Sequence, residues 1–226
     1  MPTRPRLLQG FVKLVLLVLS SIVLLPGNAI DLNRLQATLR SLGGNTQSFS
    51  EWTSMMQTYA DAPVEIRIQK VNDFFNRKII FAEDQEVWGQ SDYWATPMET
   101  LSKGKGDCED YVIAKYFSLR NMNVPDSQLR LIYVKARIGG ASSTVQQAHM
   151  VLAYYPTAEA EPLILDSLIS DIRPASRRSD LLPIFSFNSQ GVFAGVAANA
   201  VLGQGGTSRL SRWQDLLERA RREGFD

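Results

Sequence analysis

The sequence has very few of the residues that build disulfides and metal-held frameworks. Among its 226 residues there is one cysteine, Cys108, and one histidine, His149. An internal disulfide needs two cysteines, so none can form. A structural zinc site takes four ligands, mostly Cys and His, so we expect no site of this kind. The lone thiol is therefore either a small buried apolar group or a reactive one.

An excess of positive charge is lacking as well. The chain carries 24 Lys and Arg against 23 Asp and Glu, a net charge of +1. Residues 1–29 hold three of these cations and no acid, so the remainder has 21 cations against 23 anions, a balance of −2. Basic stretches interleaved with aromatic residues are missing from the sequence. We therefore expect no nucleic acid partner.

A hydrophobic run of full membrane-spanning length is the third absence. The run from Leu14 to Leu25 has 12 residues, fewer than the roughly 20 that cross a bilayer. It follows a basic start and precedes Gly27 and Ala29, the small residues expected before a cleavage site. This pattern predicts a signal peptide over residues 1–29. An uncleaved anchor built on residues 7–25 is the alternative, and residues 30–226 are expected to form one domain.

The spacing of apolar residues predicts helices in the first half of the chain. Apolar residues recur at helical spacing over residues 31–42, 49–56 and 64–75, and again near the C-terminus over residues 210–220. Residues 108–120 are apolar nearly all round, which is typical of a central buried helix. Residues 81–97 read as an irregular segment. These stripes are expected to be core residues.

After Pro125 the apolar period changes from helical to two. Strands are predicted over residues 129–138, 149–155 and 162–168, with a further one over 185–193. Residues 192–206 are rich in Gly and Ala and receive no assignment. The predicted fold class is α+β, with N-terminal helices and a central Cys-bearing helix packed on an antiparallel sheet.

Cys108 stands where a glycine-rich turn meets the predicted central helix. The turn is Gly104-Lys105-Gly106, and Asp107 is a good N-cap because its side chain can accept from N–H groups of the first helical turn. Cys108 then lies in that first turn. The partial positive charge of a helix N-terminus favours thiolate, the nucleophilic form, over thiol. The sequence therefore favours a reactive Cys108.

His149 is the one imidazole available to Cys108, and the predicted hairpin brings Asp166 to it. If the hairpin pairs Tyr155 with Ala160, antiparallel pairing places His149 opposite Asp166, with Cβ atoms about 5 Å apart. Asp166 interrupts an apolar strand, and a buried carboxylate needs a partner. We therefore expect a His149–Asp166 pair, either catalytic or purely structural.

Together these residues predict acyl transfer. Cys108 would attack a carbonyl, His149 would accept the thiol proton and pass it to the leaving amine, and Asp166 would orient the ring. The backbone N–H of Cys108 is the expected oxyanion donor. Residues 88–94 are expected to supply a second donor, and Trp94 is the candidate. Packing is the commoner role of a Trp and remains the default for Trp94.

Three carboxylates surround Cys108, and their charge opposes a thiolate. Asp107, Glu109 and Asp110 would raise the pKa of the thiol, and a bound hard cation would remove that conflict. Oxygen ligands suit calcium. Alternatively, Asp107 only caps the helix and the other two face solvent. Asp126, beyond the helix, is a further candidate ligand.

Four motifs resemble the bacterial transglutaminase-like cysteine proteinases, in particular the LapG-type periplasmic proteases. They are YWATP at residues 93–97, GKGDCEDY at 104–111, QAHMVL at 147–152 and Leu165-Asp166, and the resemblance covers roughly Val64 to Pro183. It implies a papain/transglutaminase-like fold and a catalytic triad of Cys108, His149 and Asp166. It also implies calcium bound around Asp107, Glu109 and Asp110.

The resemblance further implies a substrate, a partner and a location. The substrate would be the N-terminal region of a large RTX-type surface adhesin, whose cleavage releases biofilm cells. The partner would be an inner-membrane cyclic-di-GMP receptor of the LapD type, and the location would be the periplasm. A transglutaminase or amidase using the same triad, and a non-catalytic calcium-dependent binding module, are the alternatives.

Overall fold

The computed structural model describes residues 30–140, 143–194 and 211–225. The predicted signal peptide and the stretch 195–206, which received no assignment, lie outside these residues. The α-helices are α1 (Leu32–Ser41), α2 (Thr46–Thr58), α3 (Val64–Lys78), α4 (Asp84–Val87), α5 (Pro97–Lys103), α6 (Cys108–Asn121) and α7 (Ser211–Glu223). Two 3₁₀ turns, η1 (Asp126–Gln128) and η2 (Ala175–Arg177), follow α6 and β6.

The strands form one large and one very small sheet. Strands β3 (Leu129–Arg137), β4 (Gln146–Tyr154), β5 (Leu163–Leu165), β6 (Arg173–Pro174), β7 (Leu181–Phe187) and β8 (Val192–Ala194) make a six-stranded sheet in the order β6-β5-β4-β3-β7-β8. Every pairing in it is antiparallel. A second sheet joins β1 (Ile80–Phe81) to β2 (Lys105–Gly106) in parallel. The predicted α+β class with an antiparallel sheet is confirmed.

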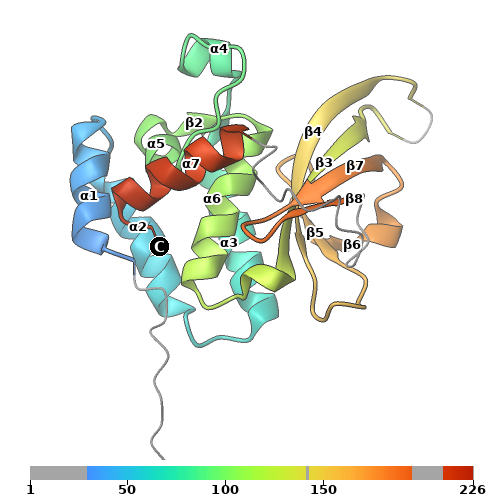
Figure 1. Ribbon diagram of the computed structural model, residues 1–226, viewed down its shortest axis with the longest axis horizontal. Coiled ribbons are helices and arrows are strands. Elements are labelled where there is room, and N and C mark those ends of the chain that lie inside the picture. Colours follow the sequence, from blue (N-terminus) through green and yellow to red (C-terminus); the bar gives the residue numbers. More distant parts are fainter. Residues whose placement is uncertain (1–29, 141–142, 195–210, 226) are drawn as a thin grey trace, which may run out of the picture.

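Helix α6 lies between the other helices and the large sheet (Figure 1). Ten consecutive residues, Asp110 to Leu119, are buried, as the apolar character of this segment predicts. One face of the sheet packs on the helix through Met150, Leu152 and Tyr154 of β4, whereas Val151 and Ala153 belong to a smaller cluster on the opposite face. The N-terminus of α6 therefore opens at the seam between the helices and the sheet.

The C-terminal helix α7 closes the helical side over α5 and α6 (Figure 1). Trp213 and Leu216 are fully buried, and Trp213 packs edge-on against Tyr116 and Phe187. The amphipathic spacing of residues 210–220 correctly predicts this helix. Among the described residues, no helix has both the length and the apolar character needed to cross a membrane.

Several boundaries differ from those that the sequence predicts. The segment 81–97, expected to be irregular, contains α4 and the start of α5. The strand expected over residues 185–193 is a hairpin of β7 and β8, because Asn188, Ser189, Gln190 and Gly191 form a turn closed by Asn188 N–H and Gly191 C=O. The strand expected to reach Leu168 ends at Leu165, so Asp166 lies just beyond the sheet.

Candidate functional site

Cys108 is the first residue of α6 and follows the two-residue strand β2. Gly104 ends α5 in the left-handed conformation with φ 63°, which glycine adopts without strain. At Gly106 a Cβ would lie 2.6 Å from Asp110 Oδ2, so only glycine allows this close approach. The glycine pattern of the turn thus positions both the thiol and the carboxylates beside it.

His149, on β4, contacts Asp166 directly. His149 Nε2 lies 2.7 Å from Asp166 Oδ1, and both side chains are buried. The predicted register is wrong by two residues, however, because β4 and β5 pair Tyr154 with Leu163 rather than Tyr155 with Ala160. A shift of two residues keeps each side chain on its face of the sheet. Asp166 is therefore a diagonal neighbour of His149 rather than the residue directly opposite, and it lies just beyond the end of β5.

The Asp166 carboxylate is held by donors on both of its oxygens. Oδ1 accepts from Leu168 N–H as well as facing His149, and Oδ2 accepts from Arg178 Nη2 at 2.6 Å. Arg178 is also buried and binds Asp180. Burial opposes the charge on Asp166, yet the hydrogen bonds from His149, Leu168 and Arg178 hold its pKa at about 2. Asp166 is therefore a carboxylate.

Cys108 and His149 line one cavity of about 360 Å³. Its other polar lining residues include Glu83, Asp92, Asp107 and Glu109, and its apolar ones include Phe81, Tyr133, Ile138 and Leu168. Phe81 and Leu168 are about half exposed, so the rim carries apolar side chains that solvent reaches. The cavity is large enough for a few residues of an extended peptide and presents the thiol and the imidazole to it.

The electrostatic setting of Cys108 differs from the one that the helix N-terminus alone predicts. Its Sγ donates to Glu109 Oε2 at 2.7 Å. Burial, followed by the charges of Glu109 and Asp107, raises the pKa of the thiol well above its ordinary value. Burial and the nearby carboxylates thus oppose the thiolate that the partial charge of the helix N-terminus favours, as the acidic neighbours of Cys108 in the sequence predict.

Asp107 does not cap α6 with its side chain. It occupies the N-cap position, but its carboxylate makes no capping hydrogen bond, so that prediction is wrong. Instead, Asp84, Asp107 and Asp110 each present an oxygen to one point, and these three oxygens lie within 4.8 Å of one another. Asp84 comes from α4, and the short parallel pairing of β1 with β2 brings the two segments together.

The Asp84, Asp107 and Asp110 cluster fits a hard cation. Each carboxylate keeps one buried oxygen with no hydrogen-bond partner: Asp84 Oδ1, Asp107 Oδ1 and Asp110 Oδ2. Burial and the neighbouring acids raise the pKa of Asp107 to about 9 and raise those of Asp84 and Asp110. Unpartnered buried carboxylate oxygens are costly, and an oxygen-ligated divalent ion would satisfy all three.

Two further carboxylates suggested by the sequence lie elsewhere. Glu109 is outside the Asp84, Asp107 and Asp110 cluster; it contacts Cys108 and accepts from Tyr133 Oη at 3.3 Å. Asp126 follows the far end of α6 and accepts from Tyr116 and Ser189 hydroxyls. A 14-residue helix is about 21 Å long, so the suggestion that Asp126 completes the site is wrong.

The sequence gives no sign of the roles of Asp84 and Arg178, and it leaves the role of Trp94 open. No local pattern marks Asp84 or Arg178, because each acts through a contact between distant segments. Trp94 is buried and stacks on Phe187 with ring centroids 5.7 Å apart. It does not line the Cys108 cavity, so packing, its default role, is the one it has.

Comparisons with known proteins support one family. The sequence model of the bacterial transglutaminase-like cysteine proteinases (BTLCP) matches residues 47–179. A comparison with curated protein sequences found no match. Similar solved structures include Legionella pneumophila LapG at 38% identity and a TM-score of 0.70, covering 85% of this chain and 99% of that one.

Two other structures of the same Legionella pneumophila protein are similar. The EGTA-treated form is 39% identical with a TM-score of 0.72, over 85% of this chain and 99% of that one. The calcium-bound form is 38% identical with a TM-score of 0.67, over 84% and 99%. The extent of the family match and of these likenesses leads to one conclusion: the chain belongs to the bacterial transglutaminase-like cysteine proteinases.

Proposed function

We propose that the protein is a calcium-dependent cysteine endopeptidase with Cys108, His149 and Asp166 as its catalytic residues. The observation that carries the proposal is the shared cavity of Cys108 and His149, with Asp166 holding the imidazole from behind. A buried His–Asp pair alone would be compatible with a structural role. Its position beside the one thiol of the chain favours catalysis.

The two nitrogens of the His149 ring have different roles. Its Nε2 faces the ionised Asp166, so this nitrogen carries the proton and donates it in a hydrogen bond. The other ring nitrogen, Nδ1, is then the base available to the thiol. Asp166 thus fixes the tautomer and stabilises the imidazolium that forms during the reaction.

The reaction proceeds through a thioester. Cys108 Sγ forms a bond to the carbonyl carbon of the scissile peptide while its proton passes to His149 Nδ1. The proton then goes to the leaving amine as the C–N bond breaks. Water, deprotonated by His149, hydrolyses the thioester and frees the thiol. The backbone N–H of Cys108, in the first turn of α6, is unused within the helix and serves as an oxyanion donor.

The cation belongs to the same proposal. Asp84, Asp107 and Asp110 would hold calcium, and the ligand role predicted for Glu109 remains a prediction. When bound, calcium supplies positive charge beside Cys108, where the carboxylates otherwise oppose thiolate formation. The calcium-bound form of the similar Legionella pneumophila protein supports the choice of ion.

The substrate, partner and location rest on the motif resemblance. We infer that the protein acts in the periplasm, where it cleaves the N-terminal region of a large RTX-type surface adhesin and so promotes biofilm dispersal. An inner-membrane cyclic-di-GMP receptor of the LapD type would sequester it. The half-exposed apolar rim at Phe81 and Leu168 suits an extended polypeptide substrate.

The test is incubation of the protein with an adhesin N-terminal fragment, with calcium or with chelator, followed by mass spectrometry. We expect two fragments with new peptide termini in calcium and intact substrate in chelator. Isopeptide-linked products would instead identify a transglutaminase. An unchanged fragment in both conditions would contradict the peptidase proposal for this substrate class, and cleavage in chelator would contradict the calcium requirement.

A further inference from the structure

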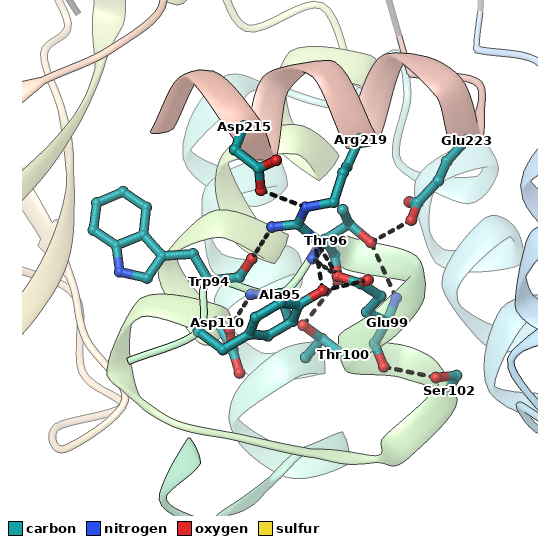
Figure 2. A network of polar contacts seen from close by, with 11 residues as sticks. Trp94, Ala95, Thr96, Glu99, Thr100, Ser102, Asp110, Asp215, Arg219 and Glu223 are labelled. Carbon is teal, nitrogen blue, oxygen red and sulfur yellow. Dashed lines mark hydrogen bonds and ion pairs between the residues drawn. The ribbon is translucent and has the colours of Figure 1, made fainter. Parts of the chain in front are cut away.

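Side chains of helix α7 form hydrogen bonds with the start of α5 and with the segment that precedes it. Figure 2 shows Arg219 and Glu223 pointing from α7 to Trp94, Thr96 and Glu99. Arg219 Nη2 donates to the Trp94 carbonyl at 2.6 Å, and Nη1 donates to Glu99 Oε2 at 2.6 Å. Glu223 Oε1 accepts from the Thr96 hydroxyl at 2.7 Å. Residues far apart in sequence are thereby fixed to one another.

One peptide group connects Arg219 to the carboxylate cluster. The Trp94 carbonyl and the Ala95 N–H belong to the same peptide unit, and Ala95 N–H donates to Asp110 Oδ1 at 2.8 Å. The peptide is trans and planar, so its C=O and N–H point in opposite directions. Because Arg219 fixes the C=O end, it also fixes the direction of the N–H at Asp110 (Figure 2).

This N–H decides which oxygen of Asp110 is left for a cation. Asp110 is fully buried, and with Oδ1 occupied by Ala95, its Oδ2 is the unpartnered oxygen. The same segment also holds Asp84, since Tyr93 N–H donates to Asp84 Oδ2 and leaves Oδ1 unpartnered. Two of the three clustered carboxylates are therefore oriented by the backbone of residues 93–95.

Arg219 is suited to this task by its own surroundings. Its Nε donates to Asp215 Oδ2 at 2.7 Å, its guanidinium lies over the Tyr93 ring, and its Nη1 contacts the Tyr93 hydroxyl. The side chain is 17% exposed, so solvent competes little for these bonds. A planar guanidinium spreads five N–H donors over a rigid fork, whereas an ammonium holds three rotatable donors at a single point and cannot span acceptors this far apart in the same way.

We propose that Arg219 is a positioning residue for the cation site, acting through the Trp94–Ala95 peptide on Asp110. This inference rests on the proposed calcium site and adds a residue that lies outside the stretch matched by the family. Groups that orient metal ligands typically change metal affinity by about 10- to 100-fold when removed. We expect a weakening of this order for Arg219→Met, and a smaller one for Arg219→Lys.

The test is isothermal titration of calcium into the chelator-treated full chain and its variants. Arg222→Ala, an exposed arginine on the same helix, is the matched control and should bind within twofold of wild type. Leu216→Val, at a fully buried position of α7, controls for general destabilisation. It should lower the urea midpoint in chelator yet leave the calcium dissociation constant unchanged.

The outcomes separate this inference from the proposed function. If wild type binds no calcium, the proposed metal site fails and the role of Arg219 fails with it. If wild type binds but Arg219→Met and Arg219→Lys both bind within twofold, only the role of Arg219 is overturned. An equal loss in Leu216→Val would also overturn it, since destabilisation of α7 would then explain the effect.

Discussion

Asp166 and its two partners show how single residues set up the site. His149 and Arg178 hold opposite oxygens of a fully buried carboxylate. The low pKa of about 2 for Asp166 means that it is ionised in the native state above that pH. Its contribution to stability is present above the ordinary aspartate pKa and is lost as the pH falls towards 2.

We predict that Arg178→Ala lowers the free energy of unfolding by about 3–5 kcal/mol, because it leaves a buried charge without its partner. The loss should be largest above pH 4, where Asp166 is ionised in both the folded and unfolded states. Urea unfolding at pH 4 and pH 7 measures it. Arg177→Ala, at the exposed neighbouring position, is the control. Equal stabilities of the two variants would contradict this account of Arg178.

The catalytic roles proposed for Cys108 and His149 give a second prediction at the residue scale. Cys108→Ala and His149→Ala should each abolish cleavage of the adhesin fragment, because one removes the nucleophile and the other its base. The folded state should persist, because Cys108→Ala removes only a small thiol and because Asp166 keeps its hydrogen bonds from Arg178 and Leu168 in His149→Ala. Turnover assays and circular dichroism check both points. Cleavage by a folded Cys108→Ala protein would refute the proposed mechanism.

At the scale of elements, the β4–β5 hairpin shows where the prediction from sequence succeeds and where it ends. Alternating apolar residues locate both strands and place His149 and Asp166 near each other. The register is wrong because residues 155–162 form the connection, which is longer than four residues. Tyr155 N–H bonds Gln128 instead of β5, and Pro162 has no N–H to extend the ladder.

The residues that the sequence does not reveal depend on contacts between distant segments. Asp84 reaches the site because β1 and β2, each of two residues, pair in parallel, and such short strands leave no periodic signal. Arg178 and Arg219 likewise look like ordinary charges in their own segments. Cys108, by contrast, is marked by its glycine turn and helix start, which are local features.

Glu223, at the end of α7, should make the free energy of unfolding depend on pH. Burial raises its pKa to about 7, so between pH 4.5 and 7 the folded state binds more protons than the unfolded state. Stability therefore falls as the pH rises through this window, by on the order of 3 kcal/mol for this residue. In Glu223→Gln that contribution should vanish.

Urea unfolding in chelator at pH 5 and pH 8 measures the effect of Glu223. From pH 5 to pH 8 the unfolding free energy of wild type should fall further than that of Glu223→Gln. The variant should therefore be more stable relative to wild type at pH 8 than at pH 5. Glu218→Gln, an exposed acid on the same helix, is the control and should match wild type. Parallel pH profiles for wild type and Glu223→Gln would contradict the prediction.

At the scale of the whole molecule, the site lies where helices and sheet meet at the N-terminus of α6. The proposed cation ligands come from the helical side, and His149 and Asp166 come from the sheet side or just beyond it. A cation bound to Asp84, Asp107 and Asp110 would thus stabilise the helical half of the seam. Ligand that binds only the folded state stabilises it by mass action.

We therefore predict that calcium at about 100 times its dissociation constant raises the free energy of unfolding by about 2.7 kcal/mol. Asp84→Asn should remove most of this gain, because it replaces a charged ligand with a neutral one. Thermal unfolding with calcium and with chelator measures the shift. Asp61→Asn, an exposed acid outside the cluster, is the control. A full calcium shift in Asp84→Asn would exclude Asp84 as a ligand.

The proposed mechanism requires a covalent bond between Cys108 and the substrate, and acid-quenched mass spectrometry detects such a bond. Protein mixed with calcium and the adhesin fragment is quenched within one turnover, digested and mapped. We predict an added mass on the Cys108 peptide equal to the acyl portion of the substrate, and no added mass in Cys108→Ala. Efficient cleavage by wild type and Cys108→Ala alike, with no adduct on Cys108, would contradict it.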